Sequence, residues 1–254
     1  SLRGVDSQGM ICSLKEIGLS EEGSGIYHLS EAVDPGTKLV DLLQHDEKIL
    51  EIDVTPNRGD SLSVYGIARD LAASQGVALE PYPSGDDLTQ YAQTDTLFKV
   101  NSRNTITYDA MTGTFDPKSL TPLFMINRLR QAGMGTNHVV VDILNYVMLE
   151  IGQPMHAFNA DALALPLQIA ESGGEAFTLL DDSLYEPKSW DTIISDQNAS
   201  HALAGIMGGY DSRMQADSTK LQLESAIFSP SGIAKSLRNC KLGSDASYRY
   251  ERGV

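Results

Sequence analysis

The chain of 254 residues, with 41% hydrophobic and 21% charged residues, has the length and composition of a globular protein with one large or two ordinary domains. No apolar run approaches the roughly 20 residues that cross a bilayer, and no signal-peptide pattern opens the sequence. Two distant cysteines exclude a cysteine-based zinc site and a disulfide framework. We therefore expect a cytoplasmic protein. The formal net charge of −15 argues against general nucleic-acid binding.

Residues 1–83 predict a small unit made mainly of loops and one helix. Residues 49–54 alternate apolar and polar side chains, which is the pattern of a strand. A turn then leads into a helix that Asp60 or Ser61 would cap and Gly76 would end. The apolar residues of this helix recur at helical spacing, at Val64, Ile67, Ala68 and Leu71. The prolines and glycine of residues 80–87 indicate a domain boundary.

Mostly β-structure is expected in the rest of the chain. Two helices are predicted among the strands: one begins at Thr121 and Pro122 and ends at Gly133, and the other begins at Ser229 and Pro230. Alternating patterns bounded by turn residues predict strands at residues 97–100, 108–114, 167–170, 177–180, 192–195, 202–204 and 221–228.

A further helix brings His156 to a forced turn. It is expected to begin at Asp142 and to carry an apolar stripe at Ile143, Val147 and Ile151. Gly152 would end this helix and Pro154 would prevent it from resuming, so that His156 and Phe158 follow a rigid corner. A polar ring beside an aromatic side chain suits the floor of a pocket. A histidine with satisfied hydrogen bonds at a helix end is the simpler alternative.

Two features further along the chain also suit a pocket. Glycines at positions 205, 208 and 209 follow a predicted strand and would let a ligand approach the backbone, although a tight turn is the simpler explanation. Glu224 shares one face of the strand at residues 221–228 with Gln222, Ala226 and Phe228. Because glutamate is seldom buried unless it is paired, Glu224 would lie beside a pocket as a hydrogen-bond acceptor, or else face solvent on an edge strand.

The segment at residues 242–254 combines small polar, aromatic and basic side chains. Ser244 and Ala246 could line a cavity with Arg249 and Arg252 at its rim. From residue 235 to 254 five basic residues stand against two acidic ones, a local surplus that could meet phosphate or could be an ordinary solvated surface. No Gly-x-Ser-x-Gly motif supports a catalytic triad of Ser244, His156 and Asp245.

Six stretches in one order resemble the β subunit of bacterial phenylalanyl-tRNA synthetase. The resemblance covers essentially the whole chain, and the common order makes it far more specific than any single motif. The stretches are residues 2–13 (Leu-Arg-Gly-Val-Asp-Ser-Gln-Gly-Met-Ile-Cys-Ser), 54–60 (Val-Thr-Pro-Asn-Arg-Gly-Asp), 141–147 (Val-Asp-Ile-Leu-Asn-Tyr-Val), 152–158 (Gly-Gln-Pro-Met-His-Ala-Phe), 205–209 (Gly-Ile-Met-Gly-Gly) and 247–253 (Ser-Tyr-Arg-Tyr-Glu-Arg-Gly).

The resemblance implies a fragment with four parts. Residues 1–19 would be the tail of an OB-like tRNA-binding domain, residues 20–83 a small helical domain, residues 84–93 a linker, and residues 94–254 the B3/B4 domain that edits mischarged tRNA. The implied fold class is α+β, with a small, mainly helical N-terminal unit before an editing domain that has a β-rich core. The later parts of the family, including its anticodon-binding domain, would be absent.

The resemblance also implies an activity. The whole enzyme of this family, an α2β2 tetramer, uses ATP and magnesium to join phenylalanine to its tRNA, and the editing domain hydrolyses tyrosine wrongly esterified to that tRNA. The implied partners are therefore the phenylalanine tRNA and the α subunit, with neither membrane nor DNA, and the fragment itself would need no cofactor or metal. A non-catalytic scaffold that binds tRNA and the α subunit is the alternative, and an unrelated small-molecule hydrolase is a third.

The pocket residues of the family fall on eight positions of this chain. His156 and Asn145 would be catalytic and would hold the terminal ribose or the attacking water. The Glu224 carboxylate would accept the tyrosine hydroxyl, and the others would shape the substrate pocket: Pro154, Gly205, Gly208, Ser244 and Ala246. A site that requires a hydroxyl discriminates well because its polar groups stay unpaired when phenylalanine enters. No strong nucleophile is evident, which favours direct attack by a positioned water.

Two positions depart from the pattern of the family. Ser244 stands where threonine is usual, which removes a methyl group from the expected pocket wall. Thr107 stands where an arginine commonly precedes the tyrosine of the first strand, so this chain lacks any contact that the arginine would make.

Overall fold

The computed structural model describes residues 4, 6, 9–19, 25–82, 97–171 and 173–254, which divide into two compact units. The first unit comprises residues 1–47 with 122–124, and the second comprises residues 48–121 with 125–254. The first unit contains the short helix α1 (Leu39–Leu42) and otherwise mainly turns. The boundary predicted at residues 80–87 falls largely outside the described residues. Within the described ranges, no helix has both the length and the apolar character needed to cross a membrane.

The second unit begins with an extended segment, the short 3₁₀ helix η1 (Gly59–Ser61) and the helix α2 (Val64–Gln75). The strand predicted at residues 49–54 is absent, because no neighbouring strand pairs with this segment and its apolar side chains are largely exposed. The predicted cap is also wrong. Ser63 caps α2 by accepting from Gly66 N at 2.9 Å, since the Asp60 carboxylate is already bound by Arg58 and Arg69 at 3.0 and 2.8 Å. Gly76 ends α2 in the left-handed region, as predicted.

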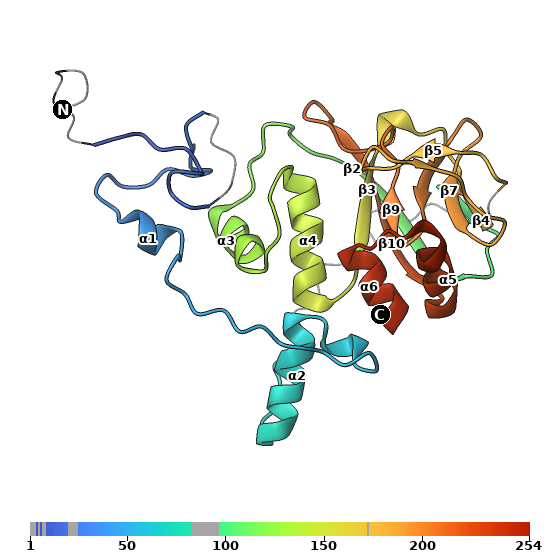
Figure 1. Ribbon diagram of the computed structural model, residues 1–254, viewed down its shortest axis with the longest axis horizontal. Coiled ribbons are helices and arrows are strands. Elements are labelled where there is room, and N and C mark those ends of the chain that lie inside the picture. Colours follow the sequence, from blue (N-terminus) through green and yellow to red (C-terminus); the bar gives the residue numbers. More distant parts are fainter. Residues whose placement is uncertain (1–3, 5, 7–8, 20–24, 83–96, 172) are drawn as a thin grey trace. The chain divides into compact units, whose positions relative to one another are not determined.

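The remainder of the second unit is built on two main sheets (Figure 1). The five-stranded sheet has the order β1 (Phe98–Val100), β4 (Leu167–Glu171), β7 (Thr192–Ser195), β8 (Ser200–Leu203) and β9 (Met207–Gly208). The three-stranded sheet has the order β2 (Thr105–Thr114), β10 (Lys220–Phe228) and β3 (Met155–Asn159). β1 and β4 are parallel and the other pairs are antiparallel, including the small pair of β5 (Phe177–Thr178) and β6 (Leu184–Tyr185). This arrangement of helices and sheets confirms the predicted α+β class.

Helix α4 (Val139–Ile151) covers one face of the three-stranded sheet, and α3 (Leu123–Gln131) precedes it along the chain. The predicted apolar stripe of α4 is wrong. The buried stripe is Val140, Leu144 and Met148, whereas Ile143 and Ile151 are exposed. Both stripes are apolar and helical in spacing, so periodicity alone could not choose between them. The helix also begins earlier than expected, because His138 caps it by accepting from Val140 N at 3.2 Å.

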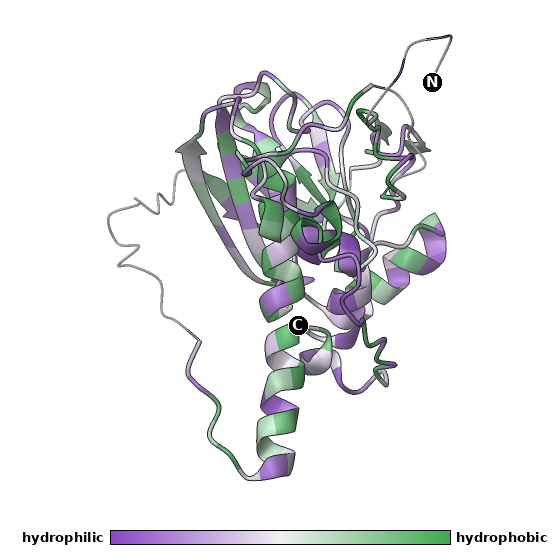
Figure 2. Ribbon diagram, turned by 90° about the vertical axis from the view of Figure 1, so that its left-hand side faces the viewer, coloured by the Kyte–Doolittle hydropathy of each residue, from purple (hydrophilic) through white to green (hydrophobic). Residues whose placement is uncertain are grey.

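The opposite face of the three-stranded sheet packs on the main hydrophobic core, which the five-stranded sheet closes from the other side. The strands alternate hydrophilic and hydrophobic residues (Figure 2). The short helix η3 (Ala160–Ala162) follows β3. The helices α5 (Pro230–Cys240) and α6 (Asp245–Arg252) contribute Ile233 and Tyr250 to the core. Helix α6 was not predicted, because its buried face carries the polar residues Ser247 and Arg249 beside Tyr250.

Candidate functional site

Glu224 lies at the centre of the three-stranded sheet. Its strand, β10, pairs with β2 on one side and β3 on the other, and Glu224 stands opposite Ala110 and His156. Only 5% of its surface is exposed, so the edge-strand alternative is wrong. The face that Glu224 shares with Gln222, Ala226 and Phe228 is the one buried against the core, as the predicted alternation requires. Its Oε2 atom has no hydrogen-bond partner in the described part of the chain.

The imidazole ring of His156, which lies on β3, occupies space that is free because position 208 is a glycine. A Cβ atom at Gly208 would stand 2.6 Å from His156 Cε1 and 2.8 Å from Nε2, so only glycine leaves room for the imidazole. The ring packs edge-on against Phe158, with 4.5 Å between the ring centroids. No atom of the described chain forms a hydrogen bond with His156 Nε2. The alternative of a histidine with satisfied hydrogen bonds therefore fails for this nitrogen.

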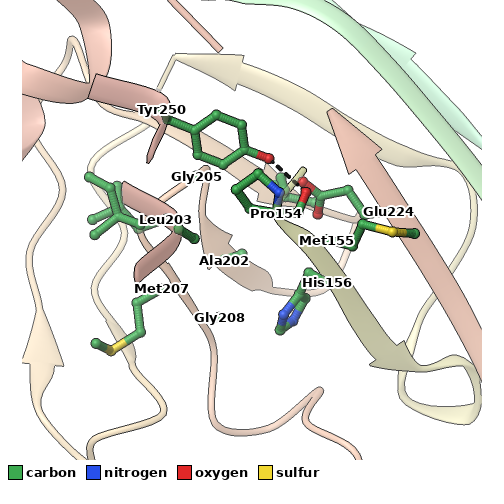
Figure 3. A pocket seen from close by; sticks show the side chains of 13 residues that line it. Pro154, Met155, His156, Ala202, Leu203, Gly205, Met207, Gly208, Glu224 and Tyr250 are labelled. Carbon is green, nitrogen blue, oxygen red and sulfur yellow. Dashed lines mark hydrogen bonds between the residues drawn. The ribbon is translucent and has the colours of Figure 1, made fainter. Parts of the chain in front are cut away.

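Glu224 and His156 share one cavity of about 80 Å³ (Figure 3). Its walls come from the start of β3, from β7 to β9, from β10 and from α6. The lining residues are Pro154, Met155, His156, Ile194, Ala202, Leu203, Gly205, Ile206, Met207, Gly208, Glu224, Ala246 and Tyr250. Most of these side chains are apolar, and a few convergent polar groups among apolar walls are typical of a small-molecule site.

Burial keeps the Glu224 carboxyl mostly neutral near pH 7 and the His156 imidazole unprotonated. It raises the pKa of the Glu224 carboxyl to about 8 and lowers the pKa of the His156 imidazole to about 4. We expected a charged carboxylate acceptor at Glu224, whereas burial favours the protonated acid, which can donate one hydrogen bond and also accept. The cavity therefore presents two neutral polar groups within a mainly apolar wall.

Gly205 forms the turn between β8 and β9. Its φ of +69° lies in the left-handed region that glycine adopts without strain. A Cβ at this position would stand 2.8 Å from side-chain atoms of both Ile233 and Phe228. A tight turn and a close approach of packed groups thus both require glycine here.

The structure brings six of the eight predicted site residues together in the cavity: Pro154, His156, Gly205, Gly208, Glu224 and Ala246. Ser244 is not part of the lining. It caps α6 and donates from Oγ to the Ile206 carbonyl at 2.7 Å, so that it supports the wall from behind. Asn145 is half-buried on α4 and does not line the cavity either. The triad disfavoured from the sequence is not formed, because Ser244 Oγ bonds elsewhere.

The arginines expected at the rim have structural contacts instead. Arg249 is buried and donates to the Leu62 carbonyl at 3.3 Å and to the Asp245 carbonyl at 2.9 Å. Arg252 stacks on the Tyr248 ring, with its guanidinium carbon 3.4 Å from the ring centroid. The exposed basic side chains of this region are those of Lys235, Arg238 and Lys241.

Tyr250 is the main lining residue that the sequence did not single out. Its ring is buried, and its hydroxyl lies 3.1 Å from the Pro154 carbonyl and 3.0 Å from the Ala226 carbonyl. The motif at residues 247–253 contains Tyr250, but a helix at this position was needed to show which of its side chains turn inward. Among the described residues, no group of three or more His, Cys, Asp or Glu side chains is arranged to hold a metal ion.

Comparisons with known proteins show which family the chain is related to. Residues 110–254 match the family model of the B3/4 domain. The chain is 40% identical over 258 residues to the phenylalanine–tRNA ligase beta subunit of Coxiella burnetii, and 41% identical over 263 residues to that of Nitrosococcus oceani. Each alignment covers 100% of this chain and 32% of the relative, so the chain spans about a third of the length of these proteins.

One solved structure, an N-terminal fragment of the phenylalanyl-tRNA synthetase beta subunit from Pyrococcus horikoshii, aligns with 74% of this chain and 61% of its own. The TM-score is 0.40 and the sequence identity is 13%, and both values are too low for this structure to identify the fold. The sequence relatives and the family match confirm the resemblance predicted from the motifs. The chain belongs to the B3/4 domain family, and along its whole length it is similar to about one third of a phenylalanine–tRNA ligase beta subunit.

Proposed function

We propose that this chain is part of a phenylalanine–tRNA ligase beta subunit, and that its cavity hydrolyses tyrosine wrongly esterified to the phenylalanine tRNA. The observation that carries the proposal is the pair of unpartnered buried atoms, Glu224 Oε2 and His156 Nε2, in one cavity with apolar walls. A buried polar atom without a partner costs about 1–3 kcal/mol. A tyrosyl ester recovers this free energy at Glu224 through its phenol hydroxyl, whereas a phenylalanyl ester leaves the Glu224 carboxyl unpaired.

The cavity is small, and the side chain of tyrosine can enter it only if the walls move apart. A drug-sized pocket encloses roughly 300–1,000 Å³, whereas this cavity measures about 80 Å³. An engineered cavity that binds benzene has about 150 Å³, so a phenol ring requires some widening of the walls. Met155 and Met207 line the cavity, and methionine side chains are flexible enough to move aside.

Selection of tyrosine follows from the protonation state of Glu224. With its pKa raised to about 8, the acid is mostly neutral at pH 7. A neutral acid and a phenol can exchange two hydrogen bonds, each group donating once. The ring of phenylalanine has no hydroxyl and would leave the Glu224 carboxyl unpaired. A site built to bind a hydroxyl in this way can reject the analogue that lacks it by up to about 10⁴- to 10⁵-fold.

Hydrolysis then needs a water molecule placed against the ester. The water oxygen forms a bond to the ester carbonyl carbon, the bond from that carbon to the ribose oxygen breaks, and the proton that the water loses is taken up by the ribose oxygen. The pKa of His156, lowered to about 4, makes the imidazole a weak general base. We assign it the role of holding the water or the ribose hydroxyl through Nε2. Asn145 takes no part in this proposal, because it does not line the cavity.

The proposal extends to the whole enzyme. The chain would act with the phenylalanine tRNA and the α subunit, in an α2β2 assembly in the cytoplasm. ATP and magnesium would serve aminoacylation elsewhere in the enzyme, and this fragment would need neither. A tRNA-binding scaffold without catalysis is the alternative outcome of the test.

The test is the first-order rate of deacylation of tyrosyl-tRNA and of phenylalanyl-tRNA, with the chain in place in the assembled ligase. The proposal predicts rapid release of tyrosine and slow release of phenylalanine. Rates for both esters equal to those without protein would support the scaffold instead.

A further inference from the structure

The antiparallel pairing of strands β10 and β3 ends beside the cavity. Its last registered pair is Ser225 with Met155, one step beyond Glu224 with His156. The next pair would join Ala226 to Pro154, and proline has no N–H to donate. The two strands therefore lack a backbone hydrogen bond from Pro154 at the position where they enter the cavity wall.

Two side chains bridge this gap. Gln153 Nε2 donates to the Pro154 carbonyl and to the Ala226 carbonyl, each at 2.9 Å. The Tyr250 hydroxyl lies 3.1 and 3.0 Å from the same two carbonyl oxygens, and Figure 3 shows it directed at the Pro154 carbonyl. One amide from the end of α4 and one hydroxyl from α6 thus meet on a single pair of carbonyls, one on each side of the gap.

We propose that Gln153 and Tyr250 are positioning residues, which fix the spacing between His156 and Glu224 so that both reach one substrate. This inference rests on the proposed function. Pro154 lies two residues before His156, and Ala226 lies two residues after Glu224, so the bridge holds the backbone of both functional side chains. In a cavity of about 80 Å³ a small separation of the strands changes which atoms can touch the ligand together.

The hydrogen bonds of Tyr250 also leave Glu224, and not Tyr250, to recognise a hydroxyl group of the ligand. The ring of Tyr250 lines the cavity, but its hydroxyl is occupied by the two carbonyls. Burial raises the pKa of this hydroxyl, so it remains a neutral donor. The hydroxyl of a tyrosine substrate is therefore left to Glu224, and loss of the bridge would weaken selection as well as rate.

The variants Tyr250→Phe and Gln153→Met each remove the bridging donor with little change of volume. Tyr185→Phe is the matched control. Tyr185 is also a buried tyrosine, its hydroxyl donates to Asp191 at 2.7 Å, and it does not line the cavity. Each variant is made in the assembled ligase, and the single-turnover deacylation rate and the half-saturating enzyme concentration are measured for tyrosyl-tRNA and phenylalanyl-tRNA, together with the melting temperature.

We expect Tyr250→Phe and Gln153→Met to slow tyrosyl-tRNA deacylation about tenfold, within the roughly hundredfold that a misplacement of about 1 Å can cost. The ratio of the tyrosyl to the phenylalanyl rate should fall, while half-saturation by tRNA stays unchanged. The control should lose at least as much thermal stability and keep both the rate and the ratio. A ratio that is unchanged in both bridge variants, or one that falls equally in the control, would overturn the inference. An inactive wild-type enzyme would instead refute the proposed function.

Discussion

Glu224 and His156 face each other across the β10–β3 ladder, and burial moves their pKa values in opposite directions. The pKa of Glu224 rises from 4.5 to about 8, and that of His156 falls from 6.5 to about 4. Between pH 4 and pH 8 the folded protein has a protonated Glu224 carboxyl and a neutral His156 imidazole. Between pH 4.5 and pH 6.5 an unfolded chain instead has an ionised Glu224 carboxylate and a protonated His156 imidazolium.

This pairing predicts an unusual dependence of stability on pH. Between pH 4.5 and 6.5 the folded and unfolded states hold the same number of protons on these two groups, so their combined contribution is flat. Between pH 6.5 and 8 the folded state holds one more proton, and its stability falls by up to about 1.4 kcal/mol per pH unit. Glu224→Gln removes this loss. Relative to the wild type, the variant should therefore gain about 2 kcal/mol from pH 6.5 to pH 8. Urea unfolding at the two pH values measures the difference, and parallel changes in both proteins would contradict it.

Replacing Glu224 should change selectivity more than chemistry. Glu224→Ala leaves the tyrosine hydroxyl without a partner, which costs about 1–3 kcal/mol, or roughly five- to 150-fold in the tyrosyl-tRNA rate. The slow rate on phenylalanyl-tRNA should hardly change. Glu224→Gln keeps a neutral donor and acceptor and should retain most of the discrimination. Equal losses on both esters in Glu224→Ala would instead make Glu224 a catalytic residue.

His156→Ala should slow both esters by a similar factor, because the imidazole is proposed to hold water or ribose rather than the amino-acid side chain. The pKa of about 4 further predicts a wild-type rate that rises through about pH 4 and is then independent of His156 ionisation up to pH 8. The measurement is the deacylation rate from pH 4 to 8, corrected for the rate without enzyme. A rise centred near pH 6.5 would show that the imidazole is solvated in the active enzyme.

Gly208→Ala should reduce hydrolysis of both esters by displacing His156. The added Cβ would lie 2.6 Å from His156 Cε1, so the ring must move. Gly135→Ala is the control, since a Cβ there meets nothing within 4 Å. The comparison uses deacylation rates at equal concentrations of folded protein. Full activity of Gly208→Ala would mean that the position of His156 in this structure is not the one used in catalysis.

Ala246→Trp should fill the cavity and abolish tyrosyl-tRNA deacylation while the protein stays folded. Ala246 is only partly buried at the start of α6, so the larger ring can project into the cavity without opening the main core. Tyr248→Trp on the exposed side of the same helix should have little effect. Circular dichroism confirms folding, and retained hydrolysis in a folded Ala246→Trp protein would place the substrate elsewhere.

The sequence predicted the elements whose signals are local. All seven expected strands after residue 93 are present, and the period-two pattern of β10 grouped Glu224 with Gln222, Ala226 and Phe228 but left open whether that face is buried. The sequence failed where tertiary contacts decide. Two apolar stripes competed on α4, and only packing selected Val140, Leu144 and Met148. The family motifs identified six lining residues. They could not show that Ser244 turns outward to cap a helix, or that Asn145 lies away from the cavity.

The order of the cavity walls along the chain has a consequence for synthesis on the ribosome. Residues 154–156 emerge first, Ile194 and the segment at residues 202–208 follow, then Glu224, and the α6 wall of Ala246 and Tyr250 comes last. Until residue 250 has left the exit tunnel, the carbonyls of Pro154 and Ala226 lack the Tyr250 hydroxyl, and the cavity lacks the wall formed by Ala246 and Tyr250. A nascent chain halted before α6 should therefore have neither the complete cavity nor the Tyr250 contacts between the two strands. Both would be acquired when the last helix docks.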